Sequence, residues 1–149
     1  MSTPASFSRH PFHPMLIPLP IGLWVFSLVS DVIFRAGWGS PVWYDVAFYT
    51  MFGGVIGALL AAVPGLIDLL SIQNPKTKKI AIWHMVLNLT AVVVYCINLW
   101  LRTRNDPMSN SPFLLSIAGI ILICISGWLG GELVYVRCVG VDRPADRNP

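Results

Sequence analysis

The sequence predicts an all-α integral membrane protein whose four spanning helices form an up-down-up-down bundle. Hydrophobic residues make up 55% of the 149 residues and charged residues only 11%, whereas a soluble domain averages about 25% charged residues. The chain contains four long apolar runs, and the links between them are short. This composition argues against a water-soluble enzyme and against a disordered chain. The net charge of +3 is too small to imply a nucleic-acid partner.

The first apolar run covers residues 17–34 and is followed by the turn residues Gly37, Gly39 and Pro41. A run of this length is typical of a spanning helix and is too long for the apolar region of a secretory signal. We therefore expect this run to be retained as the first span. The dozen residues before it, which include His10, are expected to form a flexible flank.

The other three runs cover residues 46–72, 80–101 and 113–136. Asn74 and Pro75 end the second run, and a cluster of Asn, Asp and Pro residues separates the third run from the fourth. Each run approaches or exceeds the ~18–20 residues that cross a bilayer, and a spanning segment of this kind must be helical because no water is available to its backbone. Short links make neighbouring helices antiparallel. We expect a single membrane domain over residues 1–149 and a flexible tail after residue 141.

Basic residues set the expected orientation of the bundle. The end that would carry both termini holds seven Lys and Arg residues and the opposite end holds three, namely Arg9, Lys76, Lys78, Lys79, Arg137, Arg143 and Arg147 against Arg35, Arg102 and Arg104. We therefore predict a multi-pass protein of the bacterial inner membrane with both termini in the cytoplasm.

Three acidic residues, Asp31, Asp68 and Glu132, lie within the predicted spans, and no Lys or Arg does. An ionisable group inside a membrane is costly and usually faces the interior of the bundle. The acids must therefore be neutralised by protonation, by a histidine, by a bound cation or by reaching the interface.

Four of the polar residues are expected to converge on one buried site near the cytoplasmic face. Counting from the basic residues at that end, Asp68, His84 and Glu132 all lie about 7–12 Å inside the span at 1.5 Å per residue. His13 enters from the same end. Two imidazoles and two carboxylates are suitable ligands for iron, zinc or copper, whereas calcium and magnesium prefer more oxygen ligands. We expect Asn88, Gly65 and Gly131 to lie next to these ligating side chains and to orient them.

The same residues leave other functions open. The helices that carry His13 and His84 lie diagonally in such a bundle, which suits bis-histidine ligation of a b-type haem, although Asp68 and Glu132 would crowd the ring. The residues also fit a proton or cation relay of a transporter, or a structural subunit in which polar groups specify packing. Known catalytic and phosphate-binding motifs are absent, so the sequence decides neither for nor against an enzyme.

A second polar site is expected in the outer half of the bundle. Asn98 and Tyr95 lie on one stripe of the third span, at the depth of Asp31 in the first. The alternative is that Asp31 forms an ion pair with Arg35, four residues later on the same helix.

Several segments together resemble the DUF2231 family of bacterial four-helix membrane proteins. They are His13-Pro14 with Pro18 and Pro20, Pro64-Gly65 to Asp68, His84 to Asn88, and Gly130-Gly131-Glu132 to Gly140-Val141. The resemblance implies an inner-membrane protein near membrane electron transfer, because relatives are sometimes joined to Rieske or cytochrome c domains. It implies site residues at His13, Asp68, His84 and Glu132. The expected partners are the lipid bilayer, a separate redox protein or quinone, and a second copy of the chain packed on Gly53 and Gly57.

Overall fold

The structure is a computed structural model that describes residues 4–7 and 10–141. Within these residues, four helices are long and apolar enough to cross a membrane: Phe12–Arg35, Val42–Ser71, Pro75–Arg102 and Asn110–Val136. This confirms the prediction of an all-α, four-helix membrane protein. Each helix is longer than the apolar run that predicted it, mainly because it begins three to five residues before the run.

The first span is built from two helical segments, α1 (Phe12–Leu16) and α2 (Pro18–Arg35). Pro18 and Pro20 lack backbone N–H groups, so the regular ladder of hydrogen bonds is interrupted where α1 meets α2. The second span is the single helix α3 (Val42–Ser71). Thus the short segment that carries His13 is separated from the rest of its span by two prolines.

The third span begins at a capping residue, and the fourth span changes its helix type near its end. Helix α4 (Pro75–Arg102) begins with Asn74, whose side chain accepts hydrogen bonds from the backbone N–H groups of Lys76 and Thr77 at 2.9 and 3.1 Å. Helix α5 (Asn110–Gly131) continues directly into the π-helix η1 (Glu132–Val136).

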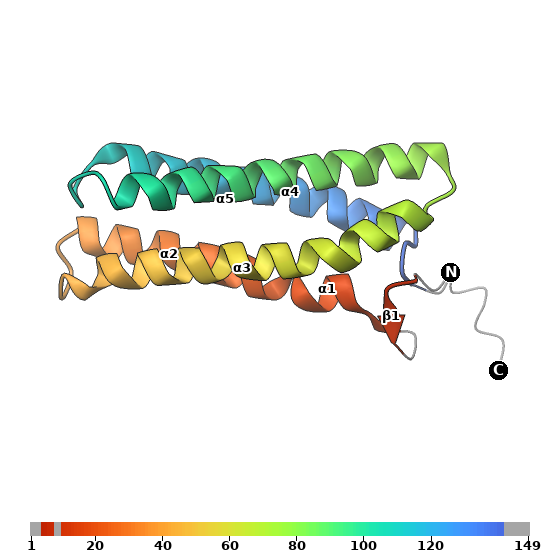
Figure 1. The fold of residues 1–149 in the computed structure, drawn as a ribbon, viewed down its shortest axis with the longest axis horizontal. Helices are drawn as coiled ribbons and strands as arrows, with labels where there is room; N and C mark the ends of the chain where they lie inside the picture. The colour runs from red at the N-terminus through yellow and green to blue at the C-terminus, as the bar shows by residue number, and fades with distance from the viewer. Residues whose placement is uncertain (1–3, 8–9, 142–149) are drawn as a thin grey trace.

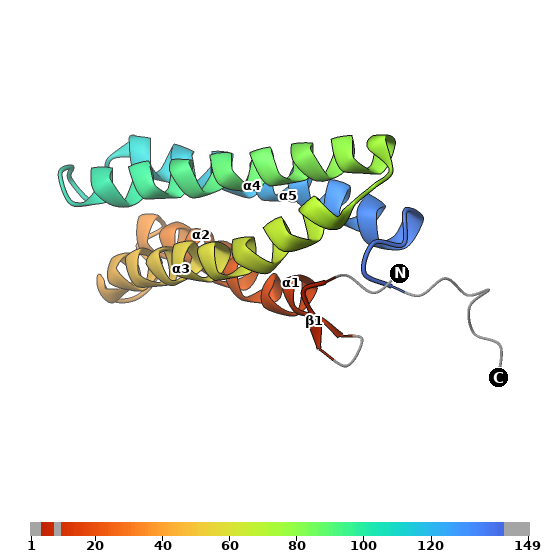
Figure 2. The ribbon, with the colours of Figure 1, turned by 45° about the vertical axis from the view of Figure 1, so that its right-hand side comes forward.

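The helices form two antiparallel hairpins that pack against each other. Helix α2 packs on α3 and α4 packs on α5, while α3–α4 and α2–α5 contacts join the two hairpins (Figure 1). Figure 2 shows the hairpins as two layers, with α4 and α5 in one and α2 and α3 in the other. Consequently α2 and α4 lie diagonally across the bundle, as predicted.

An aromatic pair lies at the centre of the core. The rings of Trp24 and Tyr95 are stacked, with centroids 4.3 Å apart, and both side chains are buried. The Trp24 Nε1–H donates to the carbonyl of Met51 at 3.2 Å. A Cβ at Gly54 would lie only 2.4 Å from that nitrogen, so a glycine is needed where the indole crosses α3.

Part of the N-terminal flank is ordered, contrary to expectation. Strands β1 (Ser6–Phe7) and β2 (His10–Pro11) pair antiparallel. Ala5 is buried, and its carbonyl accepts the backbone N–H of Phe12 at 3.0 Å. The flank therefore folds back on the start of the first span. The predicted flexible tail after residue 141 lies outside the described residues.

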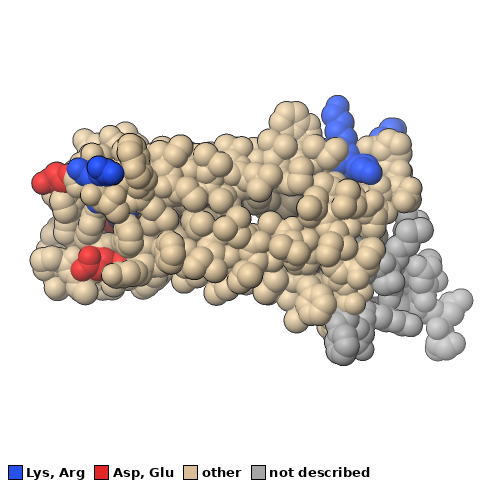
Figure 3. All heavy atoms as spheres, in the orientation of Figure 1, with Lys and Arg blue, Asp and Glu red and all other residues tan. Residues whose placement is uncertain are grey.

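Charged side chains gather at the two ends of the bundle. In the space-filling view, the long middle of the visible face carries neither Lys and Arg nor Asp and Glu (Figure 3). The same face is hollowed between the two hairpins near its middle (Figure 3). An uncharged belt between two charged ends is the surface that a bilayer requires.

Candidate functional site

The structure brings two of the predicted ligands together, namely His13 on α1 and His84 on α4. Their ring centroids are 6.2 Å apart and the ring planes are perpendicular. The two histidines come from diagonally opposed spans, so their rings meet between the two hairpins. Both side chains are partly buried.

Each imidazole is oriented by a backbone carbonyl of a neighbouring helix. His13 Nδ1 lies 2.7 Å from the carbonyl oxygen of Ala61 on α3, and His84 Nδ1 lies 2.8 Å from that of Ser126 on α5. A carbonyl oxygen can only accept a hydrogen bond, so each Nδ1 carries the proton. In the neutral imidazoles the lone pairs are therefore on the Nε2 atoms, which become the available ligands.

A small polar shell completes the surroundings of His84. The Asn88 side-chain amide lies 3.2 Å from His84 Nε2 and donates to the His84 carbonyl at 2.9 Å. The Ser126 hydroxyl lies 3.0 Å from His84 Nδ1. Asn88 thus has the supporting position expected from the sequence, although it contacts the ligand nitrogen itself rather than its far side.

Glycines allow the two imidazoles to approach their helices closely. A Cβ at Gly65 would lie 2.7 Å from His13 Nδ1, and one at Gly130 would lie 3.1 Å from His84 Cε1. Gly65 therefore packs against a histidine as expected. On α5 the residue in that position is Gly130 rather than Gly131, whose closest neighbour is Tyr135 at 3.9 Å.

The two carboxylates have other contacts. The Asp68 Oδ1 accepts a hydrogen bond from the backbone N–H of Ala5 at 3.3 Å, and the side chain is buried beneath the N-terminal segment. The Glu132 carboxylate pairs with Arg137 at 3.1 Å. Across the part of the chain that the structure describes, no three His, Cys, Asp or Glu side chains come together in a group that could hold a metal ion.

At the other end of the bundle, Asp31 forms a buried ion pair with Arg102. The two guanidinium NH groups of Arg102 donate to the two carboxylate oxygens, one of them at 2.8 Å. Asp31 is 4% exposed and Arg102 is 6% exposed. The alternative pairing of Asp31 with Arg35 is therefore wrong. Arg35 instead donates to the carbonyls of Met108 and Ser109.

Asn98 and Ser116 complete the hydrogen bonding of this ion pair. The Asn98 Oδ1 accepts from Arg102 Nε at 3.0 Å, and its amide donates to the Ser116 hydroxyl at 3.0 Å. The Ser116 hydroxyl in turn donates to Asp31 at 3.1 Å. Asp31 and Asn98 thus join one network through Arg102, as the second predicted site requires. Tyr44 connects the second span, α3, to this network, because its hydroxyl donates to the Arg102 carbonyl at 3.1 Å.

Tyr95, the third residue of that predicted site, is not hydrogen-bonded to the network. Its side chain is fully buried, and its hydroxyl is the one buried side-chain polar atom without a hydrogen-bond partner in the described part of the chain. Gly119 lies directly against the phenol, where a Cβ would be 2.7 Å from the hydroxyl.

Sequence reasoning missed Arg102 and Ser116. Arg102 ends the third apolar run and was counted among the basic residues outside the membrane. It lies four residues after Asn98, however, and so continues the polar stripe of that helix. Extending the stripe by one turn would have identified it as the partner of Asp31. Nothing in the sequence indicated that Ser116 belongs to this network, because a single serine in an apolar run is common.

One comparison agrees with the fold. Curated proteins and solved structures give no significant match to this chain. A family model described as a predicted membrane protein matches residues 9–143, which include every span and both polar sites. The chain therefore belongs to the DUF2231 family of membrane proteins.

Proposed function

We propose that this protein is a membrane haem protein in which His13 and His84 would hold the iron of a b-type haem through their Nε2 atoms. The observation that carries the proposal is the pair of Nδ1 hydrogen bonds to the carbonyls of Ala61 and Ser126. Metal-ligating histidines commonly donate their second ring N–H to a carbonyl, which fixes the tautomer and the ring orientation.

The spacing of the two rings is compatible with one metal ion held between them. With metal–nitrogen bonds of about 2.0–2.1 Å, two imidazoles on opposite sides of one metal have centroids about 6 Å apart, while tetrahedral ligands lie closer. The observed separation is 6.2 Å.

The number of ligands points the same way. A protein-bound zinc or copper ion usually takes three or four protein side chains. Haem iron needs only one or two, because the porphyrin supplies four nitrogens. Glu132 is paired with Arg137, so the crowding expected from this carboxylate does not arise.

In this arrangement the chain's own residues bind and orient the group, which would supply one-electron transfer within the membrane. His84 is held from α5 by Ser126, and His13 is held from α3 by Ala61. Asn88 Nδ2 lies beside His84 Nε2, so the amide must turn away when that nitrogen binds iron. We place the site at the cytoplasmic side of a bacterial inner membrane, because that end of the bundle carries more basic residues.

The absorption spectrum of the purified full-length protein tests the proposal. Cells supplied with a haem precursor should yield protein with a Soret band and a reduced-minus-oxidised spectrum of a b-type haem. His13→Ala and His84→Ala should each lower the haem-to-protein ratio by about tenfold or more. His10→Ala is the matched control, since it removes the third histidine of the chain and should keep the haem.

Two outcomes would contradict the haem proposal. Iron, zinc or copper bound without a Soret band, and lost in His84→Ala, would indicate a mononuclear metal site. Protein with neither metal nor haem would indicate a proton relay or a structural role for the histidines. Circular dichroism of each variant shows whether the helices are intact.

A further inference from the structure

Three pairs of side chains join the N-terminal hairpin (α1 to α3, residues 12–71) to the C-terminal hairpin (α4 to η1, residues 75–136). In each pair the second residue follows the first by 71 residues: His13 with His84, Trp24 with Tyr95, and Asp31 with Arg102. The ring centroids of the first two pairs are 6.2 and 4.3 Å apart, and the third pair is the buried ion pair. One constant shift therefore relates the first span to the third wherever these side chains meet.

Contacts within each hairpin repeat under a second constant shift. Each histidine places its Nδ1 near a carbonyl of the following span and packs on the glycine four residues later, namely Ala61 and Gly65 for His13, and Ser126 and Gly130 for His84. Each ring of the stacked pair also packs on a glycine, namely Gly54 for Trp24 and Gly119 for Tyr95. One turn before the ion pair, a polar side chain donates to a carbonyl of the following span, namely Ser27 to Ala47 and Asn98 to Pro112. In all four cases the residue of α5 follows its counterpart in α3 by the same number of residues.

These repeated contacts define a pseudo-two-fold axis that runs along the bundle. The two hairpins run in the same direction, because the histidine pair lies at one end and the ion pair at the other. The rotation that exchanges the hairpins also exchanges the α3–α4 contact with the α2–α5 contact (Figure 1). Side chains that point toward a two-fold axis meet their own counterparts, as the three pairs do.

The ion pair is the place where the two hairpins differ in charge. Asp31 and Arg102 occupy equivalent positions, so two N-terminal hairpins packed in this way would bring two aspartates together. Two C-terminal hairpins would bring two arginines together. Like charges facing each other in an interface cost several kcal/mol. Of the three pairs on the axis, the other two are compatible with a like partner, because imidazole packs on imidazole and an aromatic ring stacks on another aromatic ring.

We propose that the inner face of each hairpin is a pairing surface for another copy of the same two-span unit, and that Asp31 and Arg102 restrict each copy to the unlike one. The chain is then two versions of one helical hairpin, whose surface residues on the axis are His13, Trp24 and Asp31 in one copy and His84, Tyr95 and Arg102 in the other. A pair of two N-terminal hairpins is called a like pair below. This pairing does not depend on the proposed haem.

Cleavage of the intact protein followed by exchange of the hairpins tests the proposal. Two full-length preparations with different N-terminal tags are cut at a protease site inserted after Gln73, in the exposed link between α3 and α4. They are then mixed in mild detergent and captured by one tag. Cut wild-type protein should keep its C-terminal hairpin and form few like pairs. Asp31→Arg in one preparation should raise the like pairs with the wild-type N-terminal hairpin at least about tenfold, whereas Asp45→Arg, at an exposed aspartate of the same hairpin, should not.

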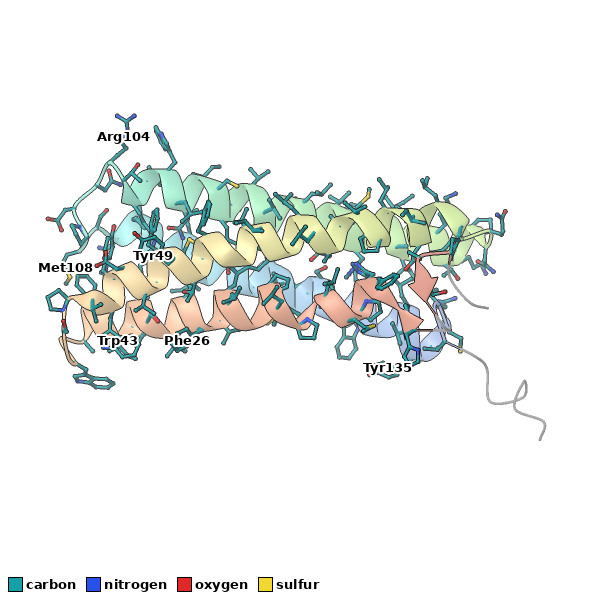
Figure 4. All side chains as sticks on the ribbon, turned by 60° about the horizontal axis from the view of Figure 1, so that its bottom comes forward. Phe26, Trp43, Tyr49, Arg104, Met108 and Tyr135 are labelled. Atoms are coloured by element: carbon teal, nitrogen blue, oxygen red, sulfur yellow. The ribbon has the colours of Figure 1, made fainter. Side chains whose placement is uncertain are left out.

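A neutral variant tests the pairing surface without any charge on the axis. With Asp31→Asn and Arg102→Asn together, like and unlike pairs contain the same contact between two asparagines and should form in comparable amounts. Asp31→Asn with Arg104→Asn is the matched control, because Arg104 is exposed and projects away from the bundle (Figure 4). That control keeps Arg102 in the C-terminal hairpin, so its unlike pairs retain a different contact from its like pairs.

Three results would overturn the proposal. Cut wild-type hairpins that separate in mild detergent would show that the inner faces do not bind each other. Absence of like pairs in both the Asp31→Arg mixture and the neutral variant would show that the two faces are not equivalent. Like pairs as abundant as unlike pairs in wild type would show that the ion pair does not select the partner.

Discussion

At the scale of single residues, the Asp31–Arg102 pair shows how this chain tolerates charges inside its bundle. Every polar group of the pair has a partner: two carboxylate oxygens, the guanidinium, and the side chains of Asn98 and Ser116. Desolvating two charges costs several kcal/mol, and the pairing offsets this cost only when the geometry is this complete. The pair therefore fixes which helix faces meet more than it adds net stability.

Removing one partner should be much worse than removing both. Arg102→Met leaves the Asp31 carboxylate buried and unpaired, which we expect to cost about 3–5 kcal/mol of unfolding free energy. Adding Asp31→Asn to that variant should restore much of the loss. Denaturant unfolding in detergent measures both, with Arg104→Met at an exposed arginine as control. Equal stability of the single and double variants would refute the coupling.

Removing the hydroxyl of Tyr95 and removing that of Tyr44 should change stability in opposite directions. The Tyr95 hydroxyl is buried without a partner, so Tyr95→Phe should leave stability unchanged or raise it by about 1 kcal/mol. The Tyr44 hydroxyl donates to the Arg102 carbonyl, so Tyr44→Phe should lower stability by about 1 kcal/mol. Thermal unfolding of the two variants side by side checks the sign. A loss at Tyr95 would show that its hydroxyl has a partner such as a bound water.

At the scale of elements, small residues of α3 form the surface on which the first span packs. Its small residues receive side chains of α1 and α2 in order along the helix. Gly54 faces Trp24, Gly57 faces Leu19 and Pro20, and Gly65 faces His13. Small residues allow close helix approach in membranes. The glycines that suggested a homodimer are used within the chain, since Gly53 contacts Leu23 and Gly57 contacts the first span.

Two adjacent glycines of α3 should differ sharply in their tolerance of alanine. At Gly54 a Cβ would meet Trp24, whose indole is held by the Tyr95 stack and by the Met51 carbonyl. Gly54→Ala should therefore cost about 1–3 kcal/mol. Gly53→Ala meets only a methyl group of Leu23 at 3.3 Å and should cost less than about 1 kcal/mol. Unfolding midpoints of the two variants decide this, and equal losses would contradict it.

At the scale of the whole molecule, the structure sharpens the charge asymmetry between the two ends. Arg102 is buried within the bundle, so it no longer counts toward the basic residues of its end. The three lysines Lys76, Lys78 and Lys79 lie at the opposite end, at the start of α4. Such an excess of basic residues marks the cytoplasmic side.

Reporter fusions check this orientation. A reporter joined after residue 75 or residue 149 should be active only in its cytoplasmic form. One joined after residue 40 or residue 108 should be active only in its periplasmic form. The reverse pattern would place the two-histidine site at the outer face. The three lysines would then not determine the orientation, and substituting them by glutamine would leave it unchanged.

The sequence was sufficient for features that follow from periodicity and length. Four spans, their order and the diagonal placement of His13 and His84 all follow from apolar runs joined by short links. The ligand set depended on a depth count, which places residues along a helix axis but says little about rotation around it. Glu132 has the right depth yet pairs with Arg137, because the π-helical turn brings Arg137, five residues later, to the same face of the helix. Arg102 was missed because a side chain of its length can reach inward from the end of a span.

The position of the two histidines has a consequence for biosynthesis. His13 is in the first span to leave the ribosome and His84 is in the third, while Ser126, which orients His84, is in the last. The Ser126 carbonyl can orient the His84 imidazole only after α5 has packed against α4. Under the proposed function, the haem would therefore bind to the finished bundle, because a chain interrupted before α5 lacks the Ser126 carbonyl that orients His84.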